Sequence, residues 1–206
     1  MKVIFLGTPD FAVPPLESII KSKHQVVAVV TQPDKPKGRS YKLTPPPVKV
    51  YAEEHLLPNG VELMQPVSLK DENFLAQLKA LEADLFIVVA FRMLPEVVWS
   101  MPSLGTFNLH GSLLPLYRGA APINWAIIKG EKESGVTTFL IDEEIDTGNI
   151  LMQRSCPIEE RETIGTLYDK LMGIGAGLVV ETVEGLVQGT LVAHPQEGKI
   201  TGAPKL

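Results

Sequence analysis

Short apolar runs and amphipathic stretches alternate along the first part of the chain. Residues 3–6 form an apolar run whose length suits a buried strand. Over 11–22 the apolar residues recur at helical spacing, and Pro14 and Pro15 fit a helix only within its first turn. The β-branched run 25–31 predicts a second strand. This order predicts a β-α-β unit with parallel strands and a right-handed crossover.

The same alternation continues to the end of the chain. The apolar run 84–90 predicts a strand whose two faces are both covered by helices. Over 163–187, apolar residues recur at intervals of three and four, which predicts a long helix with one face in the core. Further helices are expected at 48–55, 71–81 and 120–129, further strands at 105–110, 135–141 and 149–158, and weak strand character over 190–206. The order predicts an α/β fold with a doubly wound, mostly parallel, Rossmann-like sheet, whose ligands bind beyond the carboxyl ends of the strands.

Residues 32–47 interrupt this pattern. Five prolines in the segment exclude a helix or a central strand, so we expect an exposed loop. The loop holds a single acid, Asp34, and is therefore basic, which would attract phosphate groups. Its basic side chains are Lys35, Lys37, Arg39 and Lys42.

Composition and charge narrow the class of protein. A length of 206 residues with 45% hydrophobic residues suits a globular α/β domain. Because the formal net charge is −5, any nucleic-acid contact has to be local and basic. The single cysteine, Cys156, lies in a strand-like run and is expected to be buried, and a lone thiol fits the cytoplasm. No histidine pairs with another or with Cys156 at metal-ligand spacing, and the first apolar run is too short for a signal or a membrane span, so neither a metal nor a membrane is expected.

Candidate chemistry lies at the end of the strand 105–110. The first turn, 7–10, lacks the G-x-G-x-x-G pattern, which argues against a dinucleotide cofactor. Asn108 and His110 are two residues apart, so both face the same side of that strand at its carboxyl end. Histidine suits proton transfer near neutral pH, and an asparagine amide suits the stabilisation of an oxyanion.

An acidic loop, 142–148, supplies a third candidate. Asp146 stands apart from the other acids because Thr147 and Gly148 follow it. Asp-Thr-Gly also occurs in aspartic proteases, but those enzymes need two such carboxylates in an all-β frame. A single carboxylate can instead orient a histidine.

These motifs together resemble a known family. The run 108–115 (NLHGSLLP), its continuation 117–122 (YRGAAP) and the later 146–148 (DTG) are similar to formyltransferases that use 10-formyltetrahydrofolate. The opening 7–12 (GTPDFA) and the run 32–36 (QPDKP) resemble the members that formylate methionyl-tRNA. The motifs match in order over nearly the whole chain.

The resemblance implies roles for particular residues. Asn108, His110 and Asp146 would be catalytic, and the Leu114–Pro115 bond would be cis. The folate co-substrate would contact Phe86, Val88, Phe91, Leu94, Ser112, Leu113, Pro115, Ile141 and Asp142. Initiator methionyl-tRNA, the acceptor and partner, would contact Phe11, Lys35, Lys37, Arg39 and Lys42.

The resemblance also implies a domain organisation. One catalytic domain would span 1–206, with 190–206 leading into a linker, and this sequence would lack the C-terminal β-barrel domain that relatives carry. No obligate protein partner is expected.

Two alternative functions stay open. One is a formyltransferase for an amino-sugar nucleotide, which shares the 108–115 run and Asn124-Trp125; the other is a folate-binding module without catalysis.

Overall fold

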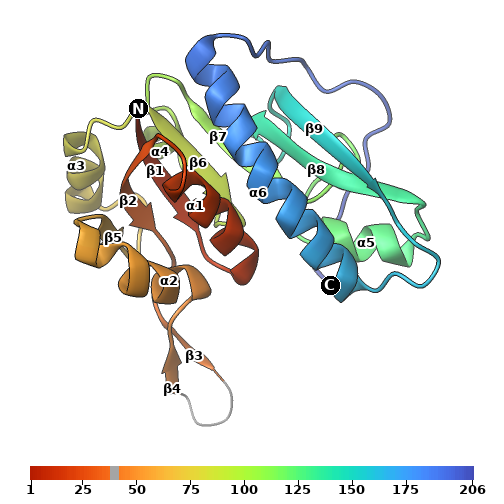
Figure 1. Cartoon of the computed structure of the whole chain (residues 1–206), viewed down its shortest axis with the longest axis horizontal. Helices are drawn as coiled ribbons and strands as arrows, with labels where there is room; N and C mark the ends of the chain where they lie inside the picture. Colours follow the sequence, from red (N-terminus) through yellow and green to blue (C-terminus); the bar gives the residue numbers. More distant parts are fainter. Residues whose placement is uncertain (38–41) are drawn as a thin grey trace. The chain divides into compact units, whose positions relative to one another are not determined.

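Two compact units, Met1–Thr106 and Phe107–Leu206, make up the chain. The computed structural model describes residues 1–37 and 42–206, and Figure 1 shows them coloured along the sequence. That the two units act as one catalytic domain stays a prediction.

The first unit is built on a parallel sheet. β1 (Lys2–Gly7) pairs with β2 (Gln25–Val30) on one side and with β6 (Leu85–Val89) on the other, and β5 (Glu62–Met64) pairs with β2. All these pairings are parallel, as the β-α-β pattern predicts. Every residue of β6 is buried, so the prediction of a strand covered on both faces is confirmed.

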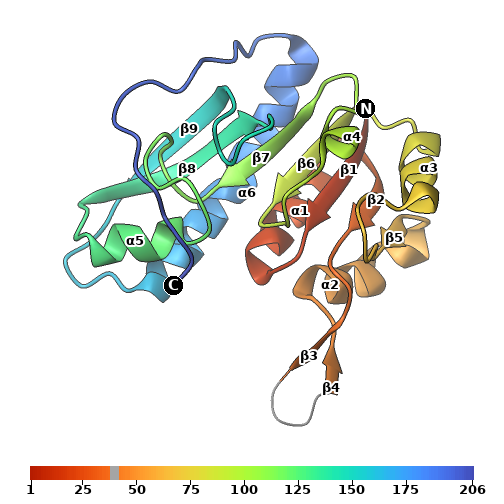
Figure 2. The same cartoon turned by 180° about the vertical axis from the view of Figure 1, so that it is seen from behind.

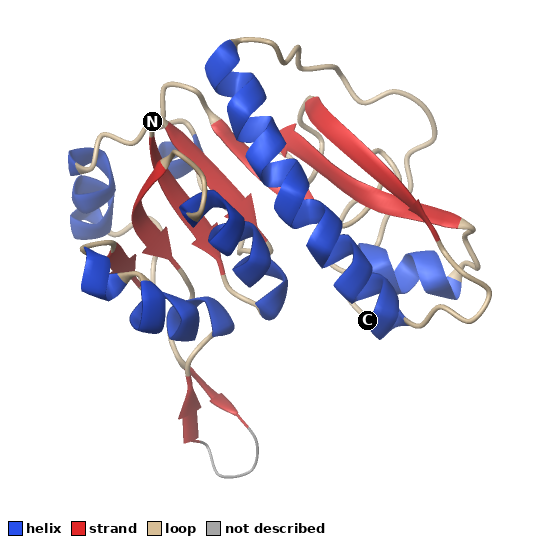
Figure 3. Cartoon of the chain, in the orientation of Figure 1, coloured by secondary structure: helices blue, strands red, loops and turns tan. Residues whose placement is uncertain are grey.

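Helices alternate with these strands (Figure 3). A 3₁₀ turn, η1 (Asp10–Ala12), leads into α1 (Val13–Ile20), whose first turn holds both prolines as expected. The later helices are α2 (Pro47–His55), η2 (Leu57–Asn59), α3 (Glu72–Ala80) and α4 (Glu96–Trp99). β5, η2 and α4 are absent from the sequence prediction because three or four residues are too few to show a period.

The basic segment is a hairpin and not an irregular loop. β3 (Lys35–Lys37) pairs antiparallel with β4 (Lys42–Thr44), and the hairpin projects from the unit below α2 in Figure 1. The prediction of a loop is therefore wrong for β3 and β4, whereas the exclusion of a central strand is confirmed. A two-stranded ribbon consists only of edge strands, so it tolerates Pro36, whose nitrogen has no hydrogen to donate. Exposure is confirmed for part of the segment, since Leu43 is 61% exposed, whereas Pro46 is buried.

The second unit holds an antiparallel sheet. β7 (Thr106–His110) pairs with β8 (Glu133–Leu140), and β8 pairs with β9 (Ile150–Pro157), both antiparallel. The parallel pairings of β1, β2, β5 and β6 therefore belong to the first unit, and the two strands expected at 135–141 and 149–158 are antiparallel neighbours. The physical reason is that the short acidic loop between them can join only antiparallel neighbours.

Two helices complete the second unit. They are α5 (Pro122–Ile128) and α6 (Ile164–Gln188), and α6 packs on β8 and β9 (Figure 1). A capping box between Thr163 and Thr166 starts α6, and Gly189 ends it with a φ of 64°. Leu167, Leu171 and Leu178 are fully buried, as the stripe predicts, whereas Ile164 remains 38% exposed. By length and composition α6 could also cross a bilayer, but burial of its apolar face in this unit accounts for that composition.

Cys156 is also part of this core. It lies in β9 with 7% of its surface exposed, which confirms the predicted buried strand position. Burial raises the pKa of its thiol, and this disfavours the nucleophilic thiolate.

The C-terminal segment, residues 190–206, forms no named strand and makes only isolated bridges. Figure 2 shows it passing the loop that precedes α5. The Arg118 N–H donates to the Thr201 carbonyl (2.9 Å), and the Ala203 N–H donates to the Arg118 carbonyl (2.6 Å). Ile150 and His194 form a second bridge. This segment is therefore hydrogen-bonded to the rest of its unit.

Candidate active site

Asn108 and His110 lie on β7 and share one face of it. Their register partners on β8 are Phe139 and Thr137. Asn108 is half-buried, and its Oδ1 atom is buried without a hydrogen-bond partner among the described residues. His110 is 6% exposed. The strand therefore places an amide and an imidazole next to each other at its carboxyl end.

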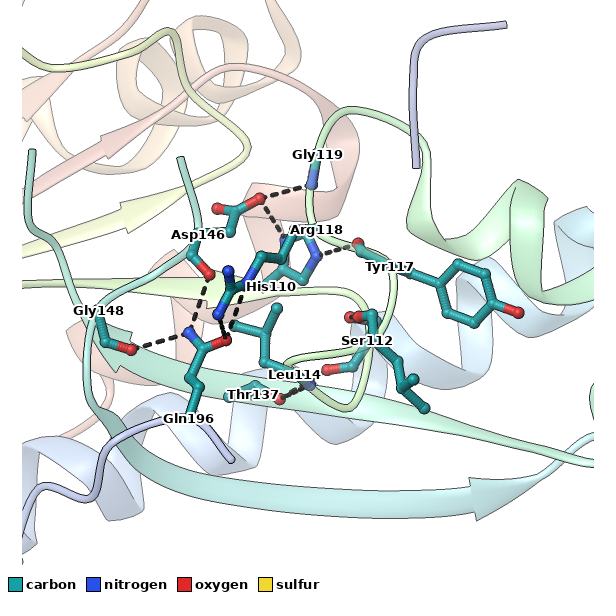
Figure 4. A network of polar contacts seen from close by, with 11 residues as sticks. His110, Ser112, Leu114, Tyr117, Arg118, Gly119, Thr137, Asp146, Gly148 and Gln196 are labelled. Atoms are coloured by element: carbon teal, nitrogen blue, oxygen red, sulfur yellow. Dashed lines mark hydrogen bonds and ion pairs between the residues drawn. The ribbon is translucent and has the colours of Figure 1, made fainter. Parts of the chain in front are cut away.

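The imidazole of His110 lies between two acceptors (Figure 4). Its Nε2 is 2.8 Å from the Tyr117 carbonyl, and its Nδ1 is 3.6 Å from Oδ2 of Asp146. Since a carbonyl can only accept, Nε2 carries a proton and Nδ1 faces the carboxylate. A second proton on Nδ1 would complete an ion pair with Asp146. The Asp146 carboxylate thus faces the ring nitrogen that would carry this second proton.

Asp146 is held in an unusual backbone conformation. Its φ is 56°, in the left-handed region, which aspartate tolerates better than most residues. The Gly119 N–H donates to its Oδ2 at 2.8 Å, and the carboxylate is only 13% exposed. The Asp146 carboxylate is therefore fixed by its own turn and by the loop before α5.

Close contact with the backbone of Leu140 explains why a glycine, Gly148, follows Asp146 and Thr147. A Cβ atom at this position would lie 1.6 Å from the Leu140 carbonyl oxygen, far inside any permitted contact. The Thr147 hydroxyl donates to Asp142 at 2.6 Å. Hence Asp-Thr-Gly is the sequence of a tight turn that presents Asp146.

Gly148→Ala tests this account of the turn. The added Cβ would displace the Leu140 backbone, so we expect a loss of unfolding free energy of about 1–3 kcal/mol. The matched control is Gly173→Ala in α6, where a Cβ meets nothing within 4 Å and alanine favours the helix. Urea unfolding of both variants is the measurement, and equal stability of the two would contradict the account.

The loop between β7 and α5 is fixed by its own hydrogen bonds. The Ser112 hydroxyl donates to the Leu116 carbonyl (2.6 Å), and Ser112 is 1% exposed. Thr137 donates to the Ser112 carbonyl (2.6 Å) and accepts from the Leu114 N–H (3.1 Å). The Leu114–Pro115 bond is cis, as expected. These bonds occupy the Ser112 hydroxyl and fix the shape of the loop.

Tyr117 lies at the turn of this loop and also presents its carbonyl to His110. Its φ is 60°, and its N–H donates to the Thr201 hydroxyl at 2.8 Å. Its own hydroxyl donates to the Glu131 carboxylate. Burial, together with this bond, raises the pKa of Tyr117 to about 12, so the phenol stays neutral.

The other folate candidates of the second unit differ in exposure. Leu113 packs against Gly135, where a Cβ would lie 2.5 Å from its side chain, and Pro115 is buried. Ile141 is half-buried, whereas Asp142 is exposed. Their contact with folate stays a prediction.

The folate candidates of the first unit lie on β6 and just after it. Phe86, Val88 and Leu94 are buried, with 1%, 4% and 7% of their surfaces exposed. Phe91 is half-buried, and the Arg92 guanidinium lies 5.6 Å from its ring centroid. Phe86 and Val88 lie within β6, whereas Phe91 and Leu94 follow its carboxyl end, where the fold class places ligands.

The acceptor candidates are only partly described. Phe11 is 5% exposed and belongs to the core, while Lys35 is exposed and donates to the Gln32 side chain. Lys37 and Lys42 form paired backbone positions of the hairpin. Arg39 lies outside the described residues. Over 1–37 and 42–206, no group of three or more His, Cys, Asp or Glu side chains could hold a metal ion.

Two polar residues of this network, Arg118 and Gln196, were not predicted as site residues from the sequence. Arg118 donates through Nε (3.0 Å) and Nη2 (2.7 Å) to Oε1 of Gln196. Gln196 lies far along the chain from any motif, and only the path of the C-terminal segment brings it here. Arg118 lies in the motif 117–122, and this position is the one sequence feature that could have identified it as a site residue.

Comparison with known proteins identifies the family. The family model described as formyl transferase matches residues 1–183 of this chain. The chain therefore belongs to the formyl transferase family. A methionyl-tRNA formyltransferase of Bacteroides fragilis is 51% identical over 211 residues, which cover 100% of this chain. The chain spans 64% of the length of that relative.

Solved structures agree on the fold. A glycinamide ribonucleotide transformylase from Symbiobacterium toebii superposes with a TM-score of 0.73 at 19% identity, covering 96% of this chain and 94% of its own. A sugar 3-N-formyltransferase, solved in the presence of dTDP and 5-N-formyl-THF, superposes with a TM-score of 0.70 at 24% identity, covering 96% of this chain and 67% of its own. The predicted α/β, Rossmann-like class with a mostly parallel sheet is thus confirmed.

Proposed function

We propose that this protein transfers the formyl group of 10-formyltetrahydrofolate to the α-amine of methionyl-tRNA, in the cytoplasm. The observation that carries the proposal is the 51% identity over the whole chain to a relative named methionyl-tRNA formyltransferase. The placement of Asn108 beside the His110–Asp146 pair supports the chemistry, because acyl transfer needs an oxyanion donor and a group that moves protons.

The reaction requires one bond to form and one to break. The α-amine attacks the formyl carbon, a C–N bond forms, and the carbonyl oxygen becomes an oxyanion. The Asn108 amide stabilises that charge by donating a hydrogen bond. Protonated His110, whose two N–H groups face the Tyr117 carbonyl and Asp146, stabilises it through its positive charge. The bond from the formyl carbon to the folate N10 then breaks, and the proton lost by the amine reaches N10. Asp146, 3.6 Å from Nδ1, keeps His110 oriented for this transfer.

The folate is proposed to bind through apolar and backbone contacts. Phe86, Val88, Phe91 and Leu94 would contribute from the first unit. Ser112, Leu113, Pro115, Ile141 and Asp142 would contribute from the second unit. The buried hydroxyl of Ser112 already donates to Leu116, so its contribution would come from its backbone.

The basic hairpin is proposed to contact the tRNA, together with Phe11. Its base is anchored, because Lys49 donates to both oxygens of Asp34 (2.9 and 2.8 Å) and Gln65 donates to one of them (2.8 Å). These bonds lower the pKa of Asp34, so the carboxylate stays charged and the anchor persists at neutral pH. Lys35, Lys37, Arg39 and Lys42 are the residues proposed to meet the tRNA phosphates.

Arg39→Ala tests the role of the hairpin. Loss of one phosphate contact should raise the KM for methionyl-tRNA and lower the slope of log KM against log salt by about 1, without changing the KM for folate. Lys132→Ala, which removes an exposed lysine of the second unit, is the charge-matched control. An equal effect of both variants, or a matching rise in the folate KM, would remove the hairpin from the tRNA site.

An acceptor comparison tests the proposed function itself. Release of tetrahydrofolate from 10-formyltetrahydrofolate would be followed with methionyl-tRNA, with a dTDP-linked amino sugar and with no acceptor. We expect release to depend on methionyl-tRNA. Dependence on the amino sugar would establish the alternative acceptor, and folate binding without release in any mixture would identify a binding module.

A further inference from the structure

Gln196 joins the turn that carries Asp146 to the loop that precedes α5. Its Nε2 donates to the carbonyl oxygens of Asp146 and Gly148, both at 2.9 Å. Its Oε1 accepts from Nε (3.0 Å) and Nη2 (2.7 Å) of Arg118. Figure 4 shows this side chain with dashed lines to Gly148, Asp146 and Arg118. It belongs to the C-terminal segment, beyond the residues 1–183 that the family model matches.

The chemistry of the four contacts fits an amide and no other side chain of this size. A guanidinium only donates, so the atom facing Arg118 has to accept. Two carbonyls only accept, so the atom facing Asp146 and Gly148 has to donate. An amide meets both demands in one orientation, whereas a carboxylate would set an acceptor against two acceptors. Gln196 is therefore matched to its surroundings through both ends of its amide.

The two segments that Gln196 joins both determine where the Asp146 carboxylate lies. The Asp146 backbone has a φ of 56°, and Gln196 binds its carbonyl in that conformation. The carboxylate accepts from Gly119, the residue that follows Arg118. A shift of either segment would change the 3.6 Å separation between Asp146 and Nδ1 of His110.

We propose that Gln196 is a positioning residue for formyl transfer, which acts by holding the Asp146 carboxylate against His110. This inference rests on the proposed function. It adds the C-terminal segment to the active site, because the residue that fixes Asp146 lies in that segment and not in the motifs around β7.

Gln196→Glu and Gln196→Ala test the proposal together. Glutamate keeps the contact with Arg118 but opposes the two carbonyls, and alanine removes all the contacts. Both variants should lower kcat by about 10- to 100-fold, because a misplacement of about 1 Å can cost this much. The KM values for folate and methionyl-tRNA and the melting temperature should stay near those of the wild type. Glu197→Ala, an exposed neighbour in the same segment, is the control.

A double-mutant cycle separates positioning from a general structural role. If Gln196 acts through Asp146, Gln196→Ala should lower kcat less than about two-fold in an Asp146→Ala background. Independent effects would multiply instead, and that result would overturn the proposal. Unchanged kcat in both single variants of an active protein would overturn it as well.

A readout without turnover keeps this inference distinct from the proposed function. In ¹⁵N-histidine-labelled protein, Gln196→Ala should move the ring signals of His110 as Asp146→Ala does, and leave those of His55 in place. If the wild type transfers no formyl group to methionyl-tRNA but this coupling is observed, the proposed function fails and the positioning of Asp146 stands. Absence of the coupling would overturn the positioning role whatever the activity.

Discussion

Asn108→Ala is expected to lower kcat for formyl transfer by about 10²–10³-fold, the typical effect of removing one oxyanion donor. The amide lies half-buried on β7, and its Oδ1 atom has no hydrogen-bond partner in the described part of the chain. Its NH2 group is the proposed hydrogen-bond donor to the oxyanion. Stopped-flow or quenched single-turnover assays would measure the rate of transfer directly.

The folate KM of Asn108→Ala should change by less than about three-fold, because the donor acts on charge that develops only in the transition state. Asn149→Ala, which removes an exposed asparagine in the loop before β9, is the matched control. A near-wild-type rate for Asn108→Ala, or a loss carried entirely by KM, would refute its assignment as an oxyanion donor.

His110→Ala is expected to lower kcat by about 10²–10⁴-fold, the usual range for loss of a general acid–base group. The ring is 6% exposed and lies between the Tyr117 carbonyl and the Asp146 carboxylate, so no other described side chain is placed to take over its role. His55→Ala, at an exposed position of α2, is the control. The kcat of both variants would be measured with saturating folate and methionyl-tRNA.

Loss of stability has to be separated from loss of chemistry for His110→Ala, since the ring packs edge-on against Phe139. Urea unfolding measures the change in stability. Added imidazole, which can fill the cavity left by the ring, tests whether formyl transfer is rescued. Retained folate binding with rescued transfer would support the catalytic role. A variant that transfers at the wild-type rate would remove His110 from the mechanism.

Periodic stretches made the larger elements predictable from sequence. Leu167, Leu171 and Leu178 repeat at helical spacing and are fully buried in α6, and the run that became β6 has no exposed residue. In both cases burial alone fixes the conformation, because one face or both faces have to leave water. The hydrophobic pattern carries that information locally.

The basic segment is where backbone pairing overturned the prediction from sequence. The run that became β3 and β4 has too many prolines and charges to resemble a strand, but backbone pairing across a ribbon requires neither apolar faces nor a central position. An apolar strand pattern does not reveal strand direction, and the antiparallel pairing of β8 and β9 follows instead from their short connection.

The candidate site was predictable to the extent that its residues lie in motifs. Asn108 and His110 are two apart on one strand, so the pattern already placed them on one face. Asp146 is brought to His110 by a turn that needs Gly148, a reason visible only in the distance to Leu140. Gln196 lies outside every motif, because its role depends on where the C-terminal segment runs and not on its neighbours in sequence.

The central claim is that this protein formylates the amine of methionyl-tRNA, and direct detection of the product tests it best. The protein would be incubated with methionyl-tRNA and 10-formyltetrahydrofolate carrying ¹³C in the formyl group, and the amino acid would be released by mild base and analysed by mass spectrometry. We predict N-formylmethionine that carries the ¹³C label, at a rate that falls in Asn108→Ala. Recovery of methionine without a formyl group after prolonged incubation, by protein that is shown to bind the folate, would contradict the claim.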